Sequence, residues 1–399
     1  MRTATRTTSD TPWERARMAD IVRADRAAYG SGKSPMANAI VEQSGVRIDS
    51  ERRRGRGAGV NPTGRFEPIT RHVFDDGWET LEELPPFKTE VQIEKPRTII
   101  TRNESPDISF DRSINPYRGC EHGCVYCFAR PSHAFMGLSP GLDFESKLFA
   151  KPDAAKLLER ELAKEGYTPR SMAIGTNTDP YQPIEEHWRI TRSILELLLE
   201  TKHPFTITTK SDRVVRDLDI IGPAARLGIA AVAISVTSLD PRVHSTLEPR
   251  APAPRKRLAA IKALSEAGVP AFASIAPVIP QVTDHELEAI VEAAAEAGAR
   301  GATFIPVRLP HEVAPLFRAW LDEHYPDRAA KVMATIQALR GGKDNDPNFF
   351  TRMRGSGPWA DLIRTRFEIA CRKHNLPRLK IPLRRDLFEP PQGDQLRLF

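Results

Sequence analysis

The sequence predicts an α/β protein built on a partial barrel of six parallel strands, with a helical extension after it and a poorly ordered basic leader before it. Two observations predict this fold. From about residue 106 onward, short apolar runs alternate with amphipathic helices, and several of these helices end in glycine just before the next apolar run. Strand, helix, glycine, strand at this repeat length is the βαβ pattern, which places parallel strands inside a layer of helices. Six such units form part of a barrel, fewer than the eight of a closed one.

Six apolar runs are the candidate strands of this sheet. They span Ile108–Asn115, Ser171–Asn177, Phe205–Lys210, Ala230–Val236, Ala271–Val278 and Gly301–Val307. Between them, apolar residues recur at helical spacing, which predicts helices. These helices are expected at 153–165, 187–202, 213–227, 253–267 and 284–297, with Gly228, Gly268 and Gly298 as C-terminal caps of the last three. After Pro310, two more helices are expected at 313–324 and 328–339.

The chain has 399 residues, which fits two domains or one large domain with tails. We expect a largely flexible leader over 1–105, because Gly, Arg and Pro dominate 52–68. Within the leader, a short helix is expected near 13–28. The core is expected over 106–310 and a helical extension over 311–385. Residues 386–399 are predicted to be a flexible tail.

Charge and hydropathy limit the location of the protein. No stretch approaches the roughly 20 consecutive apolar residues that cross a bilayer, and the N-terminus lacks the apolar region of a secretory signal. We therefore expect a cytoplasmic protein without membrane contact. The net charge of +6 is small, but basic residues gather at 51–56 and 371–385. These segments are either solvated tails or contacts to nucleic-acid phosphates.

Three of the four cysteines, Cys120, Cys124 and Cys127, fall within eight residues. Clustered reduced cysteines in an intracellular protein indicate a metal. One tight loop with three thiolates suits three irons of a [4Fe-4S] cluster and leaves the fourth iron without a cysteine. Gly119 and Gly123 let the loop bend.

The alternative metal is zinc in a Cys₃His site, with His122 or His133 as the fourth ligand. Zinc sites usually pair their cysteines in two separated knuckles, so a single loop with three cysteines fits iron–sulfur better.

The spacing Cys-x3-Cys-x2-Cys, with Tyr126 before the last cysteine and βα repeats after it, resembles the radical S-adenosylmethionine (radical SAM) superfamily over roughly 108–307. In that superfamily the open iron binds the amino and carboxylate groups of S-adenosylmethionine, and one electron cleaves the sulfonium to a 5′-deoxyadenosyl radical. The resemblance implies both cofactors, a radical-SAM barrel, and a reducing donor such as flavodoxin or ferredoxin.

The resemblance also implies that residues at the strand ends contact the cofactor. Those residues are Tyr126, Thr176, Asn177, Asp179, Lys210, Ser235 and Arg250. Many relatives carry a Gly-Gly-Glu-like stretch after the second strand, where this sequence has Thr176, Asn177 and Asp179. Lys210 resembles the carboxylate-binding lysine of the spore photoproduct lyase branch. A loop lysine, a capping serine and a surface arginine are the alternative interpretations of Lys210, Ser235 and Arg250.

The stretches NPYRGCEHGCVYCFAR, DPYQPIE and TKS resemble a bacterial group related to spore photoproduct lyase, which repairs a thymine dimer in DNA. That family uses a cysteine near the second strand, whereas 173–179 contains none. The remaining Cys371 lies in an amphipathic helix, where a buried structural cysteine is more common. Tyr181 could carry a radical, although a tyrosine at a barrel mouth more often packs or hydrogen-bonds.

The last residues resemble the Gln-Leu-x-Leu-Phe peptide by which bacterial polymerases and repair proteins dock the sliding clamp. Gln395 would fix the register, and Leu396, Leu398 and Phe399 would fill an apolar pocket. The alternative is a C-terminus that folds back onto its own core.

Together, the residues and the resemblance predict a lyase-like radical SAM enzyme acting on DNA, in repair, or on another nucleic acid. One alternative is a metal-stabilised nucleic-acid-binding protein without catalysis. Another is radical SAM modification of RNA or protein.

Overall fold

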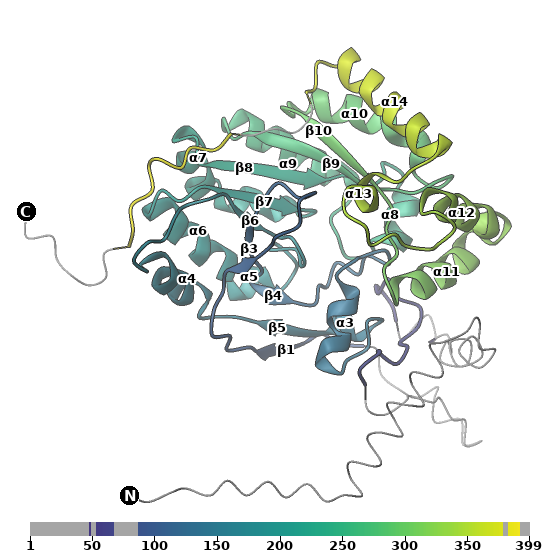
Figure 1. The fold of residues 1–399 in the computed structure, drawn as a ribbon, viewed down its shortest axis with the longest axis horizontal. Coiled ribbons are helices and arrows are strands. Elements are labelled where there is room, and N and C mark those ends of the chain that lie inside the picture. Colours follow the sequence, from purple (N-terminus) through teal and green to yellow (C-terminus); the bar gives the residue numbers. More distant parts are fainter. Residues whose placement is uncertain (1–47, 49–52, 68–86, 378–381, 392–399) are drawn as a thin grey trace, which may run out of the picture. The chain divides into compact units, whose positions relative to one another are not determined.

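The computed structural model describes residues 48, 53–67, 87–377 and 382–391 (Figure 1). The short helix expected near 13–28 and the clamp-like peptide at 395–399 lie outside these residues.

Within the described residues, the main sheet has seven strands in the order β10-β9-β8-β7-β6-β3-β2. Their bounds are β2 Thr101–Arg102, β3 Arg112–Ile114, β6 Met172–Ile174, β7 Phe205–Thr209, β8 Ala230–Ser235, β9 Ala271–Val278 and β10 Ala302–Pro306. Only β2 runs antiparallel to its neighbour, while every pair from β3 to β10 is parallel. The predicted partial barrel of six parallel strands is confirmed.

Helices between the strands cover one face of this sheet (Figure 1). They are α4 Ala154–Leu162, α5 Glu185–Trp188, α6 Ile190–Glu200, α7 Leu218–Arg226, α9 Pro254–Glu266 and α10 Leu287–Glu296. Helix α8 (Pro241–Leu247) instead shares a buried cluster with Cys124 and Val125. The three expected glycine caps have left-handed φ values of +75° at Gly228, +76° at Gly268 and +84° at Gly298. The single helix expected at 187–202 is divided into α5 and α6 at Arg189, whose φ is +50°. The sequence did not predict α8.

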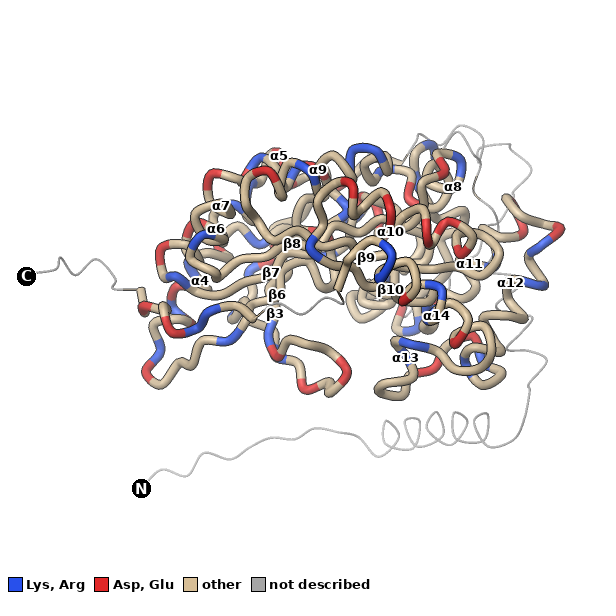
Figure 2. The backbone as a smooth tube through the Cα atoms, turned by 90° about the horizontal axis from the view of Figure 1, so that it is seen from above, with Lys and Arg blue, Asp and Glu red and all other residues tan. Residues whose placement is uncertain are grey.

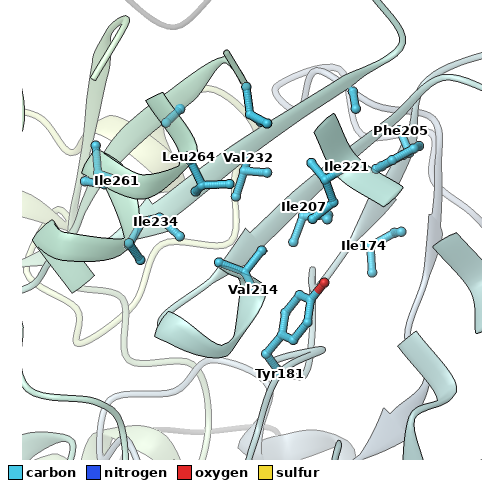
Figure 3. Packing of buried hydrophobic residues seen from close by; sticks show 14 of the residues in the cluster. Ile174, Tyr181, Phe205, Ile207, Val214, Ile221, Val232, Ile234, Ile261 and Leu264 are labelled. Atoms are coloured by element: carbon cyan, nitrogen blue, oxygen red, sulfur yellow. The ribbon is translucent and has the colours of Figure 1, made fainter. Parts of the chain in front are cut away.

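The core lies between the strands and these helices. Phe205 and Ile207 of β7 are fully buried there, together with Ile221 of α7 and Leu264 of α9 (Figure 3). Thr208 points to the opposite face of the sheet, because side chains alternate along a strand, and it is exposed. Strand β7 therefore buries its helical face and places threonines on the other.

A small sheet that the sequence did not predict flanks the cysteine loop. It has the order β1-β5-β4, with bounds β1 Glu90–Ile93, β4 Tyr117–Arg118 and β5 Lys147–Ala150. Strands β1 and β4 come before the loop in the chain and β5 comes after it. Strand β5 pairs parallel with β1 and antiparallel with β4. Strand β4 ends directly before the loop, so its pairing with β5 fixes where the loop begins. Helix α3 (Asp143–Ser146) directly precedes β5.

Helices follow the last strand, as predicted. They are α11 Val313–His324, α12 Pro326–Leu339, α13 Thr351–Arg354 and α14 Pro358–Lys373. Phe317 and Trp320 of α11 share a buried cluster with Cys124, Val125 and Tyr126, so these helices also pack against the cysteine loop. The exact domain boundaries stay a prediction.

Residues 53–67, called here the N-terminal strap, differ from the expected flexible segment. Arg56, Ala58 and Val60 are buried at 6%, 1% and 6% exposure. The reason is that the Arg56 guanidinium finds two backbone carbonyls, those of Glu145 and Phe87, inside the fold. Composition alone did not reveal these partners.

Candidate active site around the cysteine loop

The three clustered cysteines lie on one loop that follows β4. Cys120 and Cys124 are buried, and Cys127 is partly exposed. The loop turns at Gly119 and Gly123, whose φ values of +74° and +68° are left-handed and favour glycine. Because β3 leads into the loop, the cysteines lie at the carboxyl edge of the parallel strands, where barrel enzymes build their sites.

Hydrogen bonds from neighbouring segments hold the loop. The Cys120 amide donates to the Phe144 carbonyl at 3.0 Å. The Gln182 side chain accepts from the Glu121 amide at 3.0 Å and donates to the Gly119 carbonyl at 3.1 Å. Gln182, on the segment that follows β6, therefore holds the residues on both sides of Cys120.

The donor set of the loop fits an iron–sulfur cluster. Burial raises the pKa of the Cys124 thiol to about 12 and raises that of Cys120 as well, and a coordinated metal removes such a proton. Each cysteine of a [4Fe-4S] cluster binds a different iron, so the sulfurs need not converge on one point. Among the described residues, no group of three or more His, Cys, Asp or Glu side chains is gathered closely enough to hold a single metal ion.

The two histidines of the zinc alternative are engaged elsewhere. His133 contacts the Lys147 carbonyl through Nε2 at 2.9 Å and packs edge-on against Phe144. Burial lowers its pKa to about 4. The Nδ1 atom of His122 lies 3.4 Å from the Asp179 carboxylate. Each ring therefore has a structural partner other than the cysteines.

A buried polar cluster lies behind the loop. The Tyr126 hydroxyl donates to Glu248, which also pairs with the buried Arg257 and accepts from Thr237 at 2.8 Å. Burial opposes the charge of Glu248, but Arg257 and Lys210 outweigh it and lower its pKa to about 2. Glu248 is therefore an anion that anchors Tyr126.

Lys210 follows the last residue of β7 and faces this cluster. Its ammonium lies 5.7 Å from the centre of the Tyr126 ring, within the range of a cation–π contact. Burial disfavours the charge, but Cys124 and Glu248 outweigh it, so that the pKa of Lys210 is raised. The structure thus brings the predicted Lys210 and Tyr126 together beside Cys124.

Asp179 uses its carboxylate to join two strand ends. It accepts from the Thr209 hydroxyl at 2.6 Å, from the Lys210 amide at 2.7 Å and from the Tyr181 amide at 2.9 Å. Burial opposes its charge, but His122 and these hydrogen bonds lower its pKa to about 2. These contacts hold the loop after β6 against the end of β7. The cofactor contact expected of Asp179 stays a prediction.

The Asn115 side chain, directly after β3, contacts both Thr176 and Asn177. Asn115 lies 3.3 Å from the Thr176 hydroxyl and accepts from the Asn177 amide at 3.0 Å. The Asn177 side chain itself is exposed. Both residues therefore lie at the same sheet edge as the cysteines.

Arg250 lies directly beside the cysteine loop, whereas Ser235 is buried below it. The Arg250 amide donates to the His122 carbonyl at 3.3 Å, and its guanidinium pairs with Glu121 at 2.9 Å. It lines a pocket of about 350 Å³ with His122 and residues that follow β7. Ser235 is 5% exposed, and its carbonyl accepts from Arg257 at 3.2 Å.

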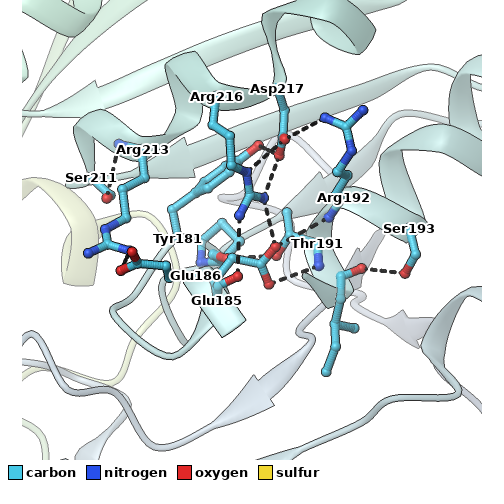
Figure 4. A network of polar contacts seen from close by, with 12 residues as sticks. Tyr181, Glu185, Glu186, Thr191, Arg192, Ser193, Ser211, Arg213, Arg216 and Asp217 are labelled. Carbon is cyan, nitrogen blue, oxygen red and sulfur yellow. Dashed lines mark hydrogen bonds and ion pairs between the residues drawn. The ribbon is translucent and has the colours of Figure 1, made fainter. Parts of the chain in front are cut away.

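Tyr181 belongs to a buried network, in agreement with the structural interpretation (Figure 4). Its hydroxyl donates to Asp217 at 3.0 Å, and Arg216 pairs with both Asp217 and Glu185. Burial and the neighbouring Asp217 raise the pKa of Tyr181. This network fastens the loop after β6 to α6 and α7.

Cys371 lies apart from the clustered cysteines. It is 5% exposed on α14 and belongs to the core between the sheet and its helices, next to Phe367 and Ala370. This environment is that of a structural cysteine.

Sequence reasoning missed an aromatic–arginine surface, formed by Phe128, Arg308, Phe349, Phe350 and Arg352. Phe128 directly follows Cys127 and is 47% exposed, and the Arg308 guanidinium lies 5.7 Å from its ring centre. Phe349 is 50% exposed with Arg352 4.8 Å from its ring centre, and Phe350 is 56% exposed. The consecutive phenylalanines in an otherwise polar stretch before α13 were the available signal.

Comparison with known proteins gives the class of this site. Residues 114–294 match the model of the radical SAM superfamily. This part of the chain therefore belongs to that superfamily, whose members use a [4Fe-4S] cluster and S-adenosylmethionine.

Individual relatives have uncharacterized functions. A protein of Mycobacterium tuberculosis is 36% identical over 226 residues, which cover 56% of this chain and 66% of that protein. A protein of Methanocaldococcus jannaschii is 27% identical over 214 residues, covering 54% of this chain and 76% of that protein. A solved structure of a spore photoproduct lyase variant has a TM-score of 0.50 at 16% identity, covering 71% of this chain and 79% of that one, which shows a similar fold.

Proposed function

We propose that this protein is a radical SAM enzyme that reductively cleaves S-adenosylmethionine, with Cys120, Cys124 and Cys127 as ligands of one [4Fe-4S] cluster. The observation that carries the proposal is the placement of three cysteines on one buried loop at the carboxyl edge of six parallel strands. When bound and reduced, the cluster supplies the electron that cleaves the sulfonium.

The surrounding residues would bind and orient the cofactor. Lys210 is a cation suited to the methionine carboxylate, and the anionic Glu248 and the Tyr126 ring keep its charge in place. Arg250 would supply a second cation beside the loop. Thr176, Asn177, Asp179 and Ser235 would supply polar contacts, and Asp179 also ties the loop after β6 to the end of β7.

The aromatic–arginine surface supports a nucleic acid as substrate. Exposed aromatic rings stack on bases of any sequence. Arg308 would add a cation beside Phe128, whereas the Arg352 guanidinium is already paired with Asp107 at 2.6 and 2.8 Å. Phe128 is adjacent in sequence to Cys127, so a base bound there would lie near the reactive centre. Figure 2 shows acidic and basic residues interspersed over the described chain, so this local surface carries the argument rather than overall charge.

The experiment that tests the chemistry is anaerobic. Protein reconstituted with iron and sulfide is reduced with dithionite, supplied with S-adenosylmethionine, and assayed for 5′-deoxyadenosine. Accumulation above a no-protein blank supports the proposal. A chain that binds four irons but yields no 5′-deoxyadenosine contradicts it and favours a non-catalytic, metal-stabilised nucleic-acid-binding protein.

Location and partners stay proposals. Among the described helices, none has the length and apolar character needed to span a bilayer. A cytoplasmic location, a flavodoxin- or ferredoxin-type donor, and a bacterial sliding clamp bound through the C-terminal peptide are the expected context. DNA repair of the lyase kind is the finer substrate proposal, and modification of RNA or protein is its alternative.

A further inference from the structure

We infer that the N-terminal strap, residues 53–67, positions the cysteine loop and, through Thr89 and Glu121, the Arg250 beside it. This inference rests on the proposed function, because it assigns the strap a role toward the cluster and toward S-adenosylmethionine. The strap lies outside residues 114–294, which match the superfamily model.

The first contact is between two glycine backbones. A Cβ atom added to Gly57 would lie 1.7 Å from the Gly123 carbonyl oxygen, far inside any allowed contact. In return, a Cβ on Gly123 would lie 3.2 Å from the Gly57 nitrogen. Gly123 lies between Cys120 and Cys124 in the chain. The strap therefore contacts the loop at the Gly123 carbonyl, between two of the cysteines.

A buried carboxylate fixes this approach. Glu145 accepts from the Gly57 amide at 2.9 Å and from the Ala58 amide at 2.8 Å. The same carboxylate pairs with Arg130 at 2.5 Å, and Arg130 donates to the Cys124 carbonyl at 2.9 Å. Glu145 and Arg130 are both fully buried. The strap and the Cys124 backbone are therefore held by the two ends of one ion pair.

A second line of contacts runs from the strap to Arg250. Arg56 donates to the Glu145 carbonyl at 2.6 Å and to the Thr89 hydroxyl at 3.0 Å. Thr89 donates in turn to Glu121, and the same Glu121 oxygen pairs with Arg250 at 2.9 Å. One hydroxyl thus connects the strap arginine to the carboxylate that orients Arg250.

Both ends of the strap are fastened to the part of the chain after the last strand. Arg53 pairs with Glu323 at the end of α11, and Arg65 pairs with Glu312, which directly precedes α11, at 2.5 Å. The strap is therefore held at both ends while its middle contacts the loop, as a positioning element requires.

The test of the loop contact is Gly57→Ala in the full chain, with Gly59→Ala as the matched control. Gly59 lies in the same strap, but an added Cβ there has no neighbour closer than 3.6 Å. After anaerobic reconstitution, Gly57→Ala is expected to bind at least twofold less iron and to show an altered electron paramagnetic resonance spectrum. Gly59→Ala should match the wild type. Wild-type iron content and spectrum in Gly57→Ala would overturn this contact's role.

The second variant, Thr89→Val, keeps the inference testable if Gly57→Ala fails to fold. Thr89 is only half-buried, and valine preserves its shape while removing the hydroxyl that links Arg56 to Glu121. We expect wild-type iron content but an equilibrium Kd for S-adenosylmethionine raised at least threefold. An unchanged Kd together with an unchanged spectrum overturns the strap's link to Arg250.

Arg250→Gln separates failure of this inference from failure of the proposed function. If Arg250→Gln weakens cofactor binding and Thr89→Val does not, the strap inference falls and the proposed contact stands. If neither variant weakens binding, the proposed Arg250 contact is wrong, and the iron content of Gly57→Ala decides the strap's role. A wild type that binds no iron overturns the proposed cluster and the inference together.

Discussion

The ammonium of Lys210 lies 5.7 Å from the centre of the Tyr126 ring, which joins the end of β7 to the cysteine loop. This contact places a cation beside Cys124 and against a ring whose hydroxyl is anchored by Glu248. It is the relationship from which the cofactor-binding prediction follows.

Lys210→Met is expected to weaken S-adenosylmethionine binding by about 10- to 100-fold, because a hydrogen bond to a charged group contributes about 1.5–3 kcal/mol. Isothermal titration of the reconstituted protein measures this change. Lys262→Met is the control, since that lysine is exposed on α9 and 3.9 Å from Glu266. Equal affinities for the two variants would contradict the role of Lys210.

Cys124→Ala is expected to remove the characteristic cluster absorption and abolish 5′-deoxyadenosine formation while the βα core stays folded. The reason is that one of three iron ligands is lost, whereas the sheet packs without it. Cys371→Ala removes an equally buried cysteine from α14 and should keep the cluster, at a cost of about 1 kcal/mol in unfolding free energy. Cofactor cleavage and full iron content in Cys124→Ala would refute the ligand assignment.

Phe128→Ala is expected to lower the affinity for a fluorescein-labelled single-stranded oligonucleotide by about 5- to 100-fold, because base–aromatic stacking contributes about 1–3 kcal/mol per base. Fluorescence anisotropy at fixed salt measures the Kd. Ile369→Ala, which removes a side chain 52% exposed on α14, is the control. If both variants bind like the wild type, Phe128 takes no part in nucleic-acid binding.

The unfolding free energy should fall as the pH drops below about 6.5, partly through His203. Burial lowers the pKa of His203 to about 4, so the unfolded chain binds a proton that the folded chain excludes. The stabilisation that the neutral His203 gives the folded chain is complete above the pKa of the unfolded chain. Its loss from pH 7 to pH 5 reduces the unfolding free energy by about 2 kcal/mol. Urea unfolding at both pH values should show a smaller difference in His203→Gln, and an identical difference would exclude His203 as the cause.

Deleting 395–399 is expected to abolish binding to the bacterial sliding clamp while leaving cofactor cleavage unchanged. The deleted peptide carries the two leucines and the phenylalanine that would fill the clamp pocket. Surface plasmon resonance against purified clamp measures the loss. Unchanged clamp binding, or unchanged survival of DNA damage in cells, would remove the clamp argument.

The fold was largely predictable because its signals are local. Alternating apolar runs and glycine caps placed all six parallel strands, and β9 was predicted with its observed bounds. The small sheet with β1, β4 and β5 was missed because its strands have two to four residues and no clear alternation.

The candidate site was less predictable, because contacts decide what its polar residues do. Lys210 and Tyr126 follow from their places at strand and loop, and the structure brings them together. Asp179 was predicted as a cofactor contact, but its three hydrogen bonds from Tyr181, Thr209 and Lys210 could not be predicted from sequence. The burial of Arg56 depends on Glu145, 89 residues later in the chain, and no local pattern contains that pairing.

The close approach of Gly57 to Gly123 also bears on where this protein can be shortened. A fragment limited to 114–294 would keep every cysteine of the loop but would lose the amides that satisfy the buried Glu145 carboxylate. A buried acceptor deprived of its donors costs about 1–3 kcal/mol or more when charged. The smallest fragment that preserves the environment of the loop therefore begins before Arg53 and extends through α11, because the strap is fastened there.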